Sequence, residues 1–156
     1  MNTAETTFRL QSGKILLNYL YIMETIQTIY LGELRTEATH VKSGNKLISD
    51  APLDNKGKGE AFSPTDLLAT SLGSCMLTLM GIAANTHDIN FSGATMKITK
   101  IMSSNPRKVA EVILDINMGG NNYSDKEKKV LEYAALTCPV ALSLHPDLIQ
   151  TVHFIY

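Results

Sequence analysis

The chain has 156 residues, of which 44% are hydrophobic and 19% are charged. This length and composition are typical of one domain with a full core, and they exclude a multidomain, low-complexity or intrinsically disordered chain. Because 14 basic residues nearly cancel 15 acidic ones, the net charge of -1 provides no field that would gather nucleic acid or an anionic membrane. We therefore expect neither of these as a partner.

The first 22 residues differ in character from the rest of the chain. A polar start is followed by the apolar run 15–23 (ILLNYLYIM), which is about half the length that a bilayer needs and lacks a small-residue cleavage site. We interpret residues 1–22 as an extension of uncertain role, either packed on the body or upstream of it, and residues 23–156 as the domain. The protein is predicted to be cytoplasmic.

The next part of the chain is predicted to begin an antiparallel sheet. Apolar residues alternate with polar ones across residues 24–37, which predicts a strand, and residues 46–49 are predicted to pair with it after a Ser-Gly-Asn turn. The glycine-rich, charged stretch 54–60 (DNKGKGE) lacks the pattern of a phosphate-binding loop. We expect it to be a flexible connection.

A long central helix is predicted from Pro64 to about Thr86. Ser63 is a suitable N-cap, proline is tolerated at the first helical position, and Asp66 lies near the positive end of the helix dipole. Between residues 67 and 84 apolar or small residues fall on every face, so no polar stripe is expected to meet water. Because a small domain cannot surround such a helix completely, the sequence favours a homodimer.

The second half of the chain is predicted to contain a hairpin, two helices and a final strand. Alternating apolar residues on both sides of a Ser-Ser-Asn-Pro turn predict a hairpin with one buried face across 96–118. A capping box at 124–127 opens a helix with a solvated charged face. The proline after Cys138 predicts a short helix that ends near residue 145, and the alternating tail 151–156 predicts a strand.

Cys75 and Cys138 are the only candidates for strong nucleophiles. They are too few for a disulfide-stapled scaffold and too far apart for a CxxC metal site. Cys75 falls inside the predicted central helix, where an isolated thiol usually behaves as a small, inert hydrophobe. Cys138 falls at a helix N-terminus, which lowers a thiol pKa, so a reactive role and a structural role are both open for it.

A buried thiolate needs a fixed positive charge, which arginine supplies best because its guanidinium stays protonated. The chain offers Arg9, Arg35 and Arg107. Arg35 is predicted within an apolar strand, an unusual place for a surface charge, although an exposed charge on an edge strand is an equal alternative. The four histidines have no metal-ligand spacing, and no GxSxG, GxGxxG or paired-carboxylate motif is present.

Three segments carry a more specific pattern: YLGELRTEATHVKSG around Arg35, FSPTDLLATSLGSCM around Cys75 and LTCPV around Cys138. Together they resemble the OsmC/Ohr family of bacterial thiol peroxidases, with similarity across residues 23–156. The resemblance implies an α+β fold in which antiparallel sheets pack around a central buried helix. It also implies an intertwined homodimer with active sites at the subunit interface.

The resemblance further implies that Cys75 is the peroxidatic thiol, Cys138 the resolving thiol and Arg35 the cation that activates Cys75. The substrates would be organic hydroperoxides and, less well, hydrogen peroxide. Attack by the Cys75 thiolate would leave a sulfenic acid, which Cys138 would condense into a disulfide. An external dithiol would reduce this disulfide. No metal, flavin or haem would be required.

One position departs from the family pattern. Many members carry a glutamate directly after the helix-opening proline, where this chain has Thr65. Either Glu60 or Asp66 is expected to replace that carboxylate as the partner of Arg35, with Glu60 favoured, unless the arginine is held otherwise. The alternative function, from a different class, is a stress-associated dimer that binds a small apolar ligand and whose cysteines are not catalytic.

Overall fold

The computed structural model describes residues 24–156, so the extension predicted for residues 1–22 lies outside the described residues. The fold is α+β, as predicted. It has two three-stranded sheets, and a long helix follows the first sheet and precedes the second in the sequence. The elements in chain order are β1 (Ile26–Gly32), β2 (Arg35–His40), β3 (Lys46–Asp50), the short 3-10 helix η1 (Leu53–Asn55), α1 (Pro64–Thr86), β4 (Thr95–Ser104), β5 (Arg107–Asn117), α2 (Asp125–Leu136), α3 (Pro139–Ser143) and β6 (Ile149–Ile155).

The first sheet corrects one prediction, because residues 24–37 form two strands rather than one. β1 and β2 pair antiparallel around a turn at Glu33 and Leu34, whose φ angles are 50° and 62°. Two successive positive φ values suit a tight hairpin but usually require Asn-Gly or Asp-Gly, so Glu-Leu carries no turn signal. Arg35 is therefore the first residue of β2. The predicted pairing with residues 46–49 is confirmed, since β3 pairs antiparallel with β2.

The segment before α1 is also more ordered than the predicted flexible connection. Its backbone forms hydrogen-bonded turns, in which Gly57 N–H donates to Pro52 O at 3.0 Å and Gly59 N–H donates to Ala51 O at 3.3 Å. A Cβ atom at Gly57 would lie 1.7 Å from Ala51 O, so only glycine allows this close backbone approach. These turns connect the end of β3 to the start of α1.

The predicted start and end of α1 are confirmed. Ser63 Oγ accepts from the backbone N–H of Asp66, whose carboxylate accepts from the N–H of Ser63, which completes a capping box. One face of the helix is buried and follows helical spacing through Ala69, Leu72, Gly73, Met76, Met80 and Ala84. α1 is long and apolar enough to cross a membrane. Buried core helices of soluble proteins have the same length and composition, so this property is weak evidence for a membrane span.

The opposite face of α1 departs from the prediction that no polar stripe meets water. Ser71, Ser74, Thr78 and Ile82 are exposed along it. The hydroxyls of Ser71 and Thr78 donate to the carbonyls of Leu68 and Ser74, at 2.7 and 2.8 Å. Because these hydroxyls are satisfied within the helix, the face does not depend on water for their hydrogen bonds.

The second sheet contains the predicted hairpin of β4 and β5, joined antiparallel. β6 adds to β5 as a parallel strand, whereas antiparallel sheets were expected. α2 begins at the predicted capping box of Ser124 and Glu127, and α3 follows Cys138 but ends at Ser143. The core between α1, α2 and this sheet is made by large buried side chains: Leu72, Met76, Met80, Val112, Leu114, Ile116, Met118 and Leu131.

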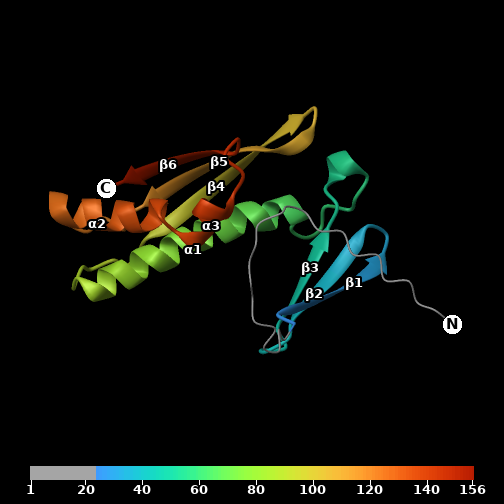
Figure 1. Cartoon of the computed structure of the whole chain (residues 1–156), viewed down its shortest axis with the longest axis horizontal. Coiled ribbons are helices and arrows are strands. Elements are labelled where there is room, and N and C mark those ends of the chain that lie inside the picture. The colour runs from blue at the N-terminus through green and yellow to red at the C-terminus, as the bar shows by residue number, and fades with distance from the viewer. Residues whose placement is uncertain (1–23) are drawn as a thin grey trace, which may run out of the picture.

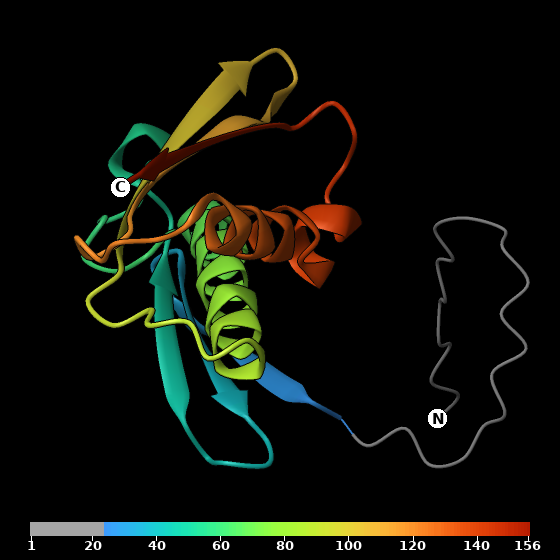
Figure 2. The same ribbon diagram turned by 90° about the vertical axis from the view of Figure 1, so that its left-hand side faces the viewer.

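The two sheets lie on opposite sides of α1 (Figures 1 and 2). The β4–β6 sheet, α2 and α3 extend along the helix, whereas the β1–β3 sheet extends away from its N-terminal end (Figure 1). Apolar side chains of the first sheet consequently lack cover in one chain, and Ile26 and Tyr30 are 60% and 65% exposed. This arrangement leaves the apolar side chains of β1 open to a neighbour.

Candidate functional site

The structure brings the two cysteines together from separate elements. Cys75 lies in the middle of α1, and Cys138 is the N-cap of α3, which packs on α1. The Cys75 thiol lies close enough to Cys138 to raise its pKa, and both are free thiols. Cys75 is half-buried at the edge of the core, whereas Cys138 has 0% exposure. The pair therefore has one accessible thiol and one enclosed thiol.

The environment of Cys138 corrects the prediction of a lowered thiol pKa. Burial raises its pKa, the nearby Cys75 thiol raises it further, and N–H groups at the start of α3 only partly oppose these effects. Cys138 Sγ accepts from the N–H of Ala141 at 3.4 Å. α3 has only five residues, so its dipole is small compared with that of a long helix. Desolvation therefore raises the pKa of Cys138 by more than the N-terminus of α3 lowers it.

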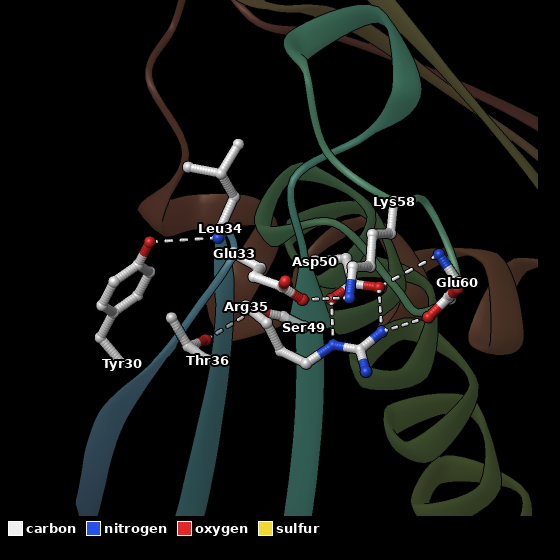
Figure 3. A network of polar contacts seen from close by, with 9 residues as sticks. All are labelled: Tyr30, Glu33, Leu34, Arg35, Thr36, Ser49, Asp50, Lys58 and Glu60. Carbon is white, nitrogen blue, oxygen red and sulfur yellow. Dashed lines mark hydrogen bonds and ion pairs between the residues drawn. The ribbon is translucent and has the colours of Figure 1, made fainter.

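A second polar cluster surrounds Arg35 at the end of the first sheet (Figure 3). Arg35 Nε donates to Asp50 Oδ1 at 2.6 Å, and Nη2 donates to Asp50 Oδ2 at 2.8 Å and to Glu60 Oε2 at 2.7 Å. The side chain of Asp50 is 2% exposed and that of Glu60 is 63% exposed. The adjoining pair of Lys58 and Glu33 completes the cluster.

These contacts favour the charged forms of both main partners. Hydrogen bonds to Asp50 and then to Glu60 raise the pKa of Arg35, so it stays protonated at any physiological pH. The Arg35 guanidinium lowers the pKa of Asp50 more than burial raises it. The cluster thus holds a permanent cation between two carboxylates of very different exposure.

Asp66, the other carboxylate that the sequence suggested for Arg35, lies elsewhere. Its Oδ1 accepts from Lys100 Nζ at 2.7 Å, and Lys100 also donates to Thr65 Oγ1 at 2.8 Å. Hydrogen bonds with Lys100 and Ser63 lower the Asp66 pKa despite its desolvation, which has the larger single effect in the opposite direction. The start of α1 therefore binds Lys100, and Glu60 is the suggested carboxylate that contacts Arg35.

Sequence reasoning missed Asp50. It is the last residue of β3 and lies opposite Arg35 in the β2–β3 register. This pairing becomes visible only when Arg35 is assigned to the strand that pairs with β3. A charged residue at the end of a strand is by itself a weak indication of a functional site. Prediction of Asp50 as the partner of Arg35 would have required the register of β2 and β3.

Within one chain the structure does not bring Arg35 and Cys75 together. The polar partners of Arg35 among residues 24–156 are Asp50 and Glu60. Cys75 lies more than three turns along α1 from its N-cap Ser63, about 18 Å at the helical rise. The thiol pair and the arginine cluster are thus two separate clusters within one chain.

A cavity of about 680 Å³ lies beside the exposed carboxylate of Glu60. Its walls include the apolar side chains of Phe62, Ala69, Met96 and Ile98, with Glu60, Asp66 and Lys100 as charged groups. Such a volume suits a small molecule with an apolar body and a polar end. In the described part of the chain, no group of three or more His, Cys, Asp or Glu side chains could hold a metal ion.

Comparisons with known proteins identify the family and the fold. The family model for OsmC-like protein matches residues 57–151. A solved structure from Psychrobacter arcticus, assigned to an osmotic stress induced and detoxification response protein, is 51% identical, with a TM-score of 0.82 over 88% of this chain and 99% of that chain. No curated protein matches.

Two more distant solved structures show the same fold. An organic hydroperoxide resistance protein OsmC from Legionella pneumophila is 18% identical, with a TM-score of 0.68 over 89% of this chain and 100% of its own. An OsmC-like protein from Mycoplasma pneumoniae is 19% identical, with a TM-score of 0.69 over 87% of this chain and 100% of its own. At these identities the likeness concerns the fold.

Proposed function

This chain belongs to the OsmC-like protein family, and on that premise we propose that it is a cysteine-based peroxidase that reduces organic hydroperoxides. The proximity of the thiols of Cys75 and Cys138 is the observation that carries the proposal. Two free thiols that lie near each other on separate elements are the arrangement that a reversible disulfide requires. The name of the Legionella relative supports the class of substrate.

The different burial of the two thiols supports the roles that we propose for them. Cys75 is the attacking residue, because it is half-buried and a substrate can reach it, whereas Cys138 is enclosed. The Cys75 thiolate attacks the distal peroxide oxygen, the O–O bond breaks, and the departing alkoxide takes a proton to become an alcohol. Cys75 is thereby oxidised to a sulfenic acid.

Cys138 then resolves this sulfenic acid. Its sulfur attacks the Cys75 sulfur, the S–O bond breaks, and the leaving hydroxide takes the Cys138 proton to form water. The product is a Cys75–Cys138 disulfide, which an external dithiol reduces by thiol–disulfide exchange while becoming oxidised itself. These steps use only the two cysteines of the chain, the peroxide and the dithiol.

A homodimer is part of the proposal, because one chain holds its arginine cluster away from its thiols. We assign activation of Cys75 to Arg35 of a second subunit, which stabilises the thiolate electrostatically. The uncovered β1–β3 sheet and the exposed face of α1 are the surfaces that support this assignment. Glu60, in contact with Arg35, is included in the same site.

The cavity beside Glu60 supports an organic hydroperoxide over hydrogen peroxide. Its apolar side chains can contact the carbon chain of an organic hydroperoxide, which hydrogen peroxide lacks. The same cavity favours the second candidate function, a small-ligand-binding dimer whose cysteines are not catalytic. Titration of free thiols separates the two functions, since two thiols that persist after peroxide treatment would favour the ligand-binding protein.

Peroxide consumption with dithiothreitol as the dithiol tests the proposal. We expect the protein to consume cumene hydroperoxide faster than hydrogen peroxide, and to form an intrachain disulfide that peptide mass spectrometry identifies. Cys75→Ser should be inactive. Cys138→Ser should still react once with peroxide but form no intrachain disulfide. The proposal fails if neither peroxide is consumed, or if Cys75→Ser keeps the activity.

A further inference from the structure

We infer that Asp50 is the residue that positions Arg35 for the thiol chemistry, in place of the carboxylate that is missing at Thr65. The inference rests on the proposed function and names a residue that the sequence pattern did not indicate. Asp50 touches neither thiol in the described chain, so it is a positioning residue that acts through the guanidinium of Arg35.

The two carboxylates of the cluster hold Arg35 in different ways. Asp50 accepts from both Nε and Nη2, a two-pronged contact that fixes the plane of the guanidinium as well as its position. Glu60 accepts only from Nη2 and is largely exposed to solvent. An exposed single contact is screened by water and contributes little, so Asp50 is the principal partner.

Asp50 is itself held by the backbone around it. It lies opposite Arg35 in the sheet register, and its own N–H donates to Phe62 O at 3.0 Å. Its Oδ2 also accepts from the backbone N–H of Glu60 at 3.1 Å, a contact that does not involve the Glu60 side chain. The carboxylate is thus fixed by a strand, a loop and the arginine together.

This geometry leaves one edge of the guanidinium free. Nε and Nη2 face the two carboxylates, whereas Nη1 points away from both (Figure 3). Among residues 24–156 no group accepts a hydrogen bond from Nη1 of Arg35. We therefore expect Nη1 to be the donor that meets the thiolate or the peroxide oxygen at a subunit interface.

The start of α1 cannot supply the positioning carboxylate in this chain. Thr65 carries no charge, and its hydroxyl accepts from Lys100, as does Asp66. In this chain the main carboxylate partner of Arg35 therefore lies at the end of β3, on the strand adjacent to β2.

The test measures how fast iodoacetamide alkylates Cys75 as a function of pH in a Cys138→Ser background. Arg35→Met should move the midpoint of this curve upward and slow alkylation at pH 7 by about tenfold or more. Asp50→Asn should slow it by about threefold or more, and Glu60→Gln should slow it less. Glu37→Gln is the matched control, because Glu37 forms an ion pair with Lys46 in the same sheet. It should leave the curve unchanged.

A double variant separates positioning from a general structural effect. If Asp50 acts through Arg35, adding Asp50→Asn to Arg35→Met should cause no further change in the Cys75 curve. A further slowing by the second substitution would overturn the inference. If Asp50→Asn alone does not fold, Arg35→Lys replaces it, since lysine keeps the charge but cannot make the two-pronged contact. A wild-type curve for Arg35→Lys would also overturn the inference.

The outcomes distinguish this inference from the proposed function. If Arg35→Met changes the curve while Asp50→Asn does not, or if Glu60→Gln has the larger effect, the inference about Asp50 is wrong and the assignment of Arg35 stands. If Arg35→Met leaves the curve unchanged, Arg35 does not activate Cys75. In that case both the inference about Asp50 and the assignment of Arg35 are wrong, while peroxide consumption still tests the peroxidase activity separately.

Discussion

At the scale of single residues, we expect burial to decide which of the two neighbouring thiols reacts first. Cys138 is enclosed, and burial together with the adjacent Cys75 raises its pKa, so little thiolate forms there at neutral pH. Cys75 is half-buried and accessible. A resolving thiol benefits from such protection, because it stays reduced until a sulfenic acid forms next to it.

Partial alkylation of the reduced protein checks this order. With substoichiometric iodoacetamide at pH 7, peptide mass spectrometry should find the label on Cys75 before Cys138. A raised pKa also shifts reaction of Cys138 toward alkaline pH, so its labelling should increase only when the pH exceeds the ordinary range of a thiol. Equal labelling at neutral pH, in protein shown to be folded by circular dichroism, would contradict the assigned roles.

At the scale of elements, the two long helices begin with the same capping box but in different surroundings. Ser63 is buried, and its hydroxyl contacts Asp66, Thr65 and Lys100. Ser124 is exposed, and among residues 24–156 its hydroxyl contacts Glu127 alone. Removal of the Ser63 hydroxyl should therefore leave more polar groups without a partner.

We accordingly expect Ser63→Ala to lower the free energy of unfolding by about 1 to 2 kcal/mol, and Ser124→Ala by only about 0.5 to 1 kcal/mol. Chemical denaturation of both variants at one protein concentration measures the difference, since association would make stability depend on concentration. A larger loss for Ser124→Ala would show that the contacts around Lys100 do not stabilise the start of α1.

These caps also show why some elements were predictable from sequence and others were not. A capping box is a local signal, so Ser63 and Ser124 marked their helices correctly. The turn at Glu33 and Leu34 uses residues that rarely adopt positive φ, and only pairing with the neighbouring strand imposes it. The contact between Arg35 and Asp50 depends on that register, so it could not be predicted once the turn was missed.

At the scale of the whole molecule, one chain leaves much of its apolar surface uncovered. Only 33% of the most apolar stretch of α1 is buried within the chain. The β1–β3 sheet exposes Ile26, Ile29 and Tyr30 on a layer that stands away from the body (Figure 1). Exposed apolar surface on this scale usually marks an interface, and a second copy would cover both regions.

The exposed face of α1 offers a direct test of this homodimer. Thr78 lies in the middle of that face, and its hydroxyl is bound to Ser74 O, so close packing of a second helix would leave it satisfied. Thr78→Arg would place a long, charged side chain in the contact, where burial of an unpaired charge is costly. Thr137→Arg is the matched control, because Thr137 is an exposed helix-end threonine whose hydroxyl is bound in the same way to Tyr133 O.

Size-exclusion chromatography with light scattering at micromolar concentration should find a dimer for the wild type and Thr137→Arg, and a monomer for Thr78→Arg. If Arg35 acts across the interface, the same monomer should also lose peroxide consumption, although it keeps both cysteines and its own arginine cluster. Because Thr78 lies one helical turn from Cys75, iodoacetamide labelling of Cys75 in Thr78→Arg should show that the thiol is still accessible, so that the loss can be attributed to separation of the subunits. A stable wild-type monomer, or a Thr78→Arg monomer with full activity, would contradict a site shared between two chains.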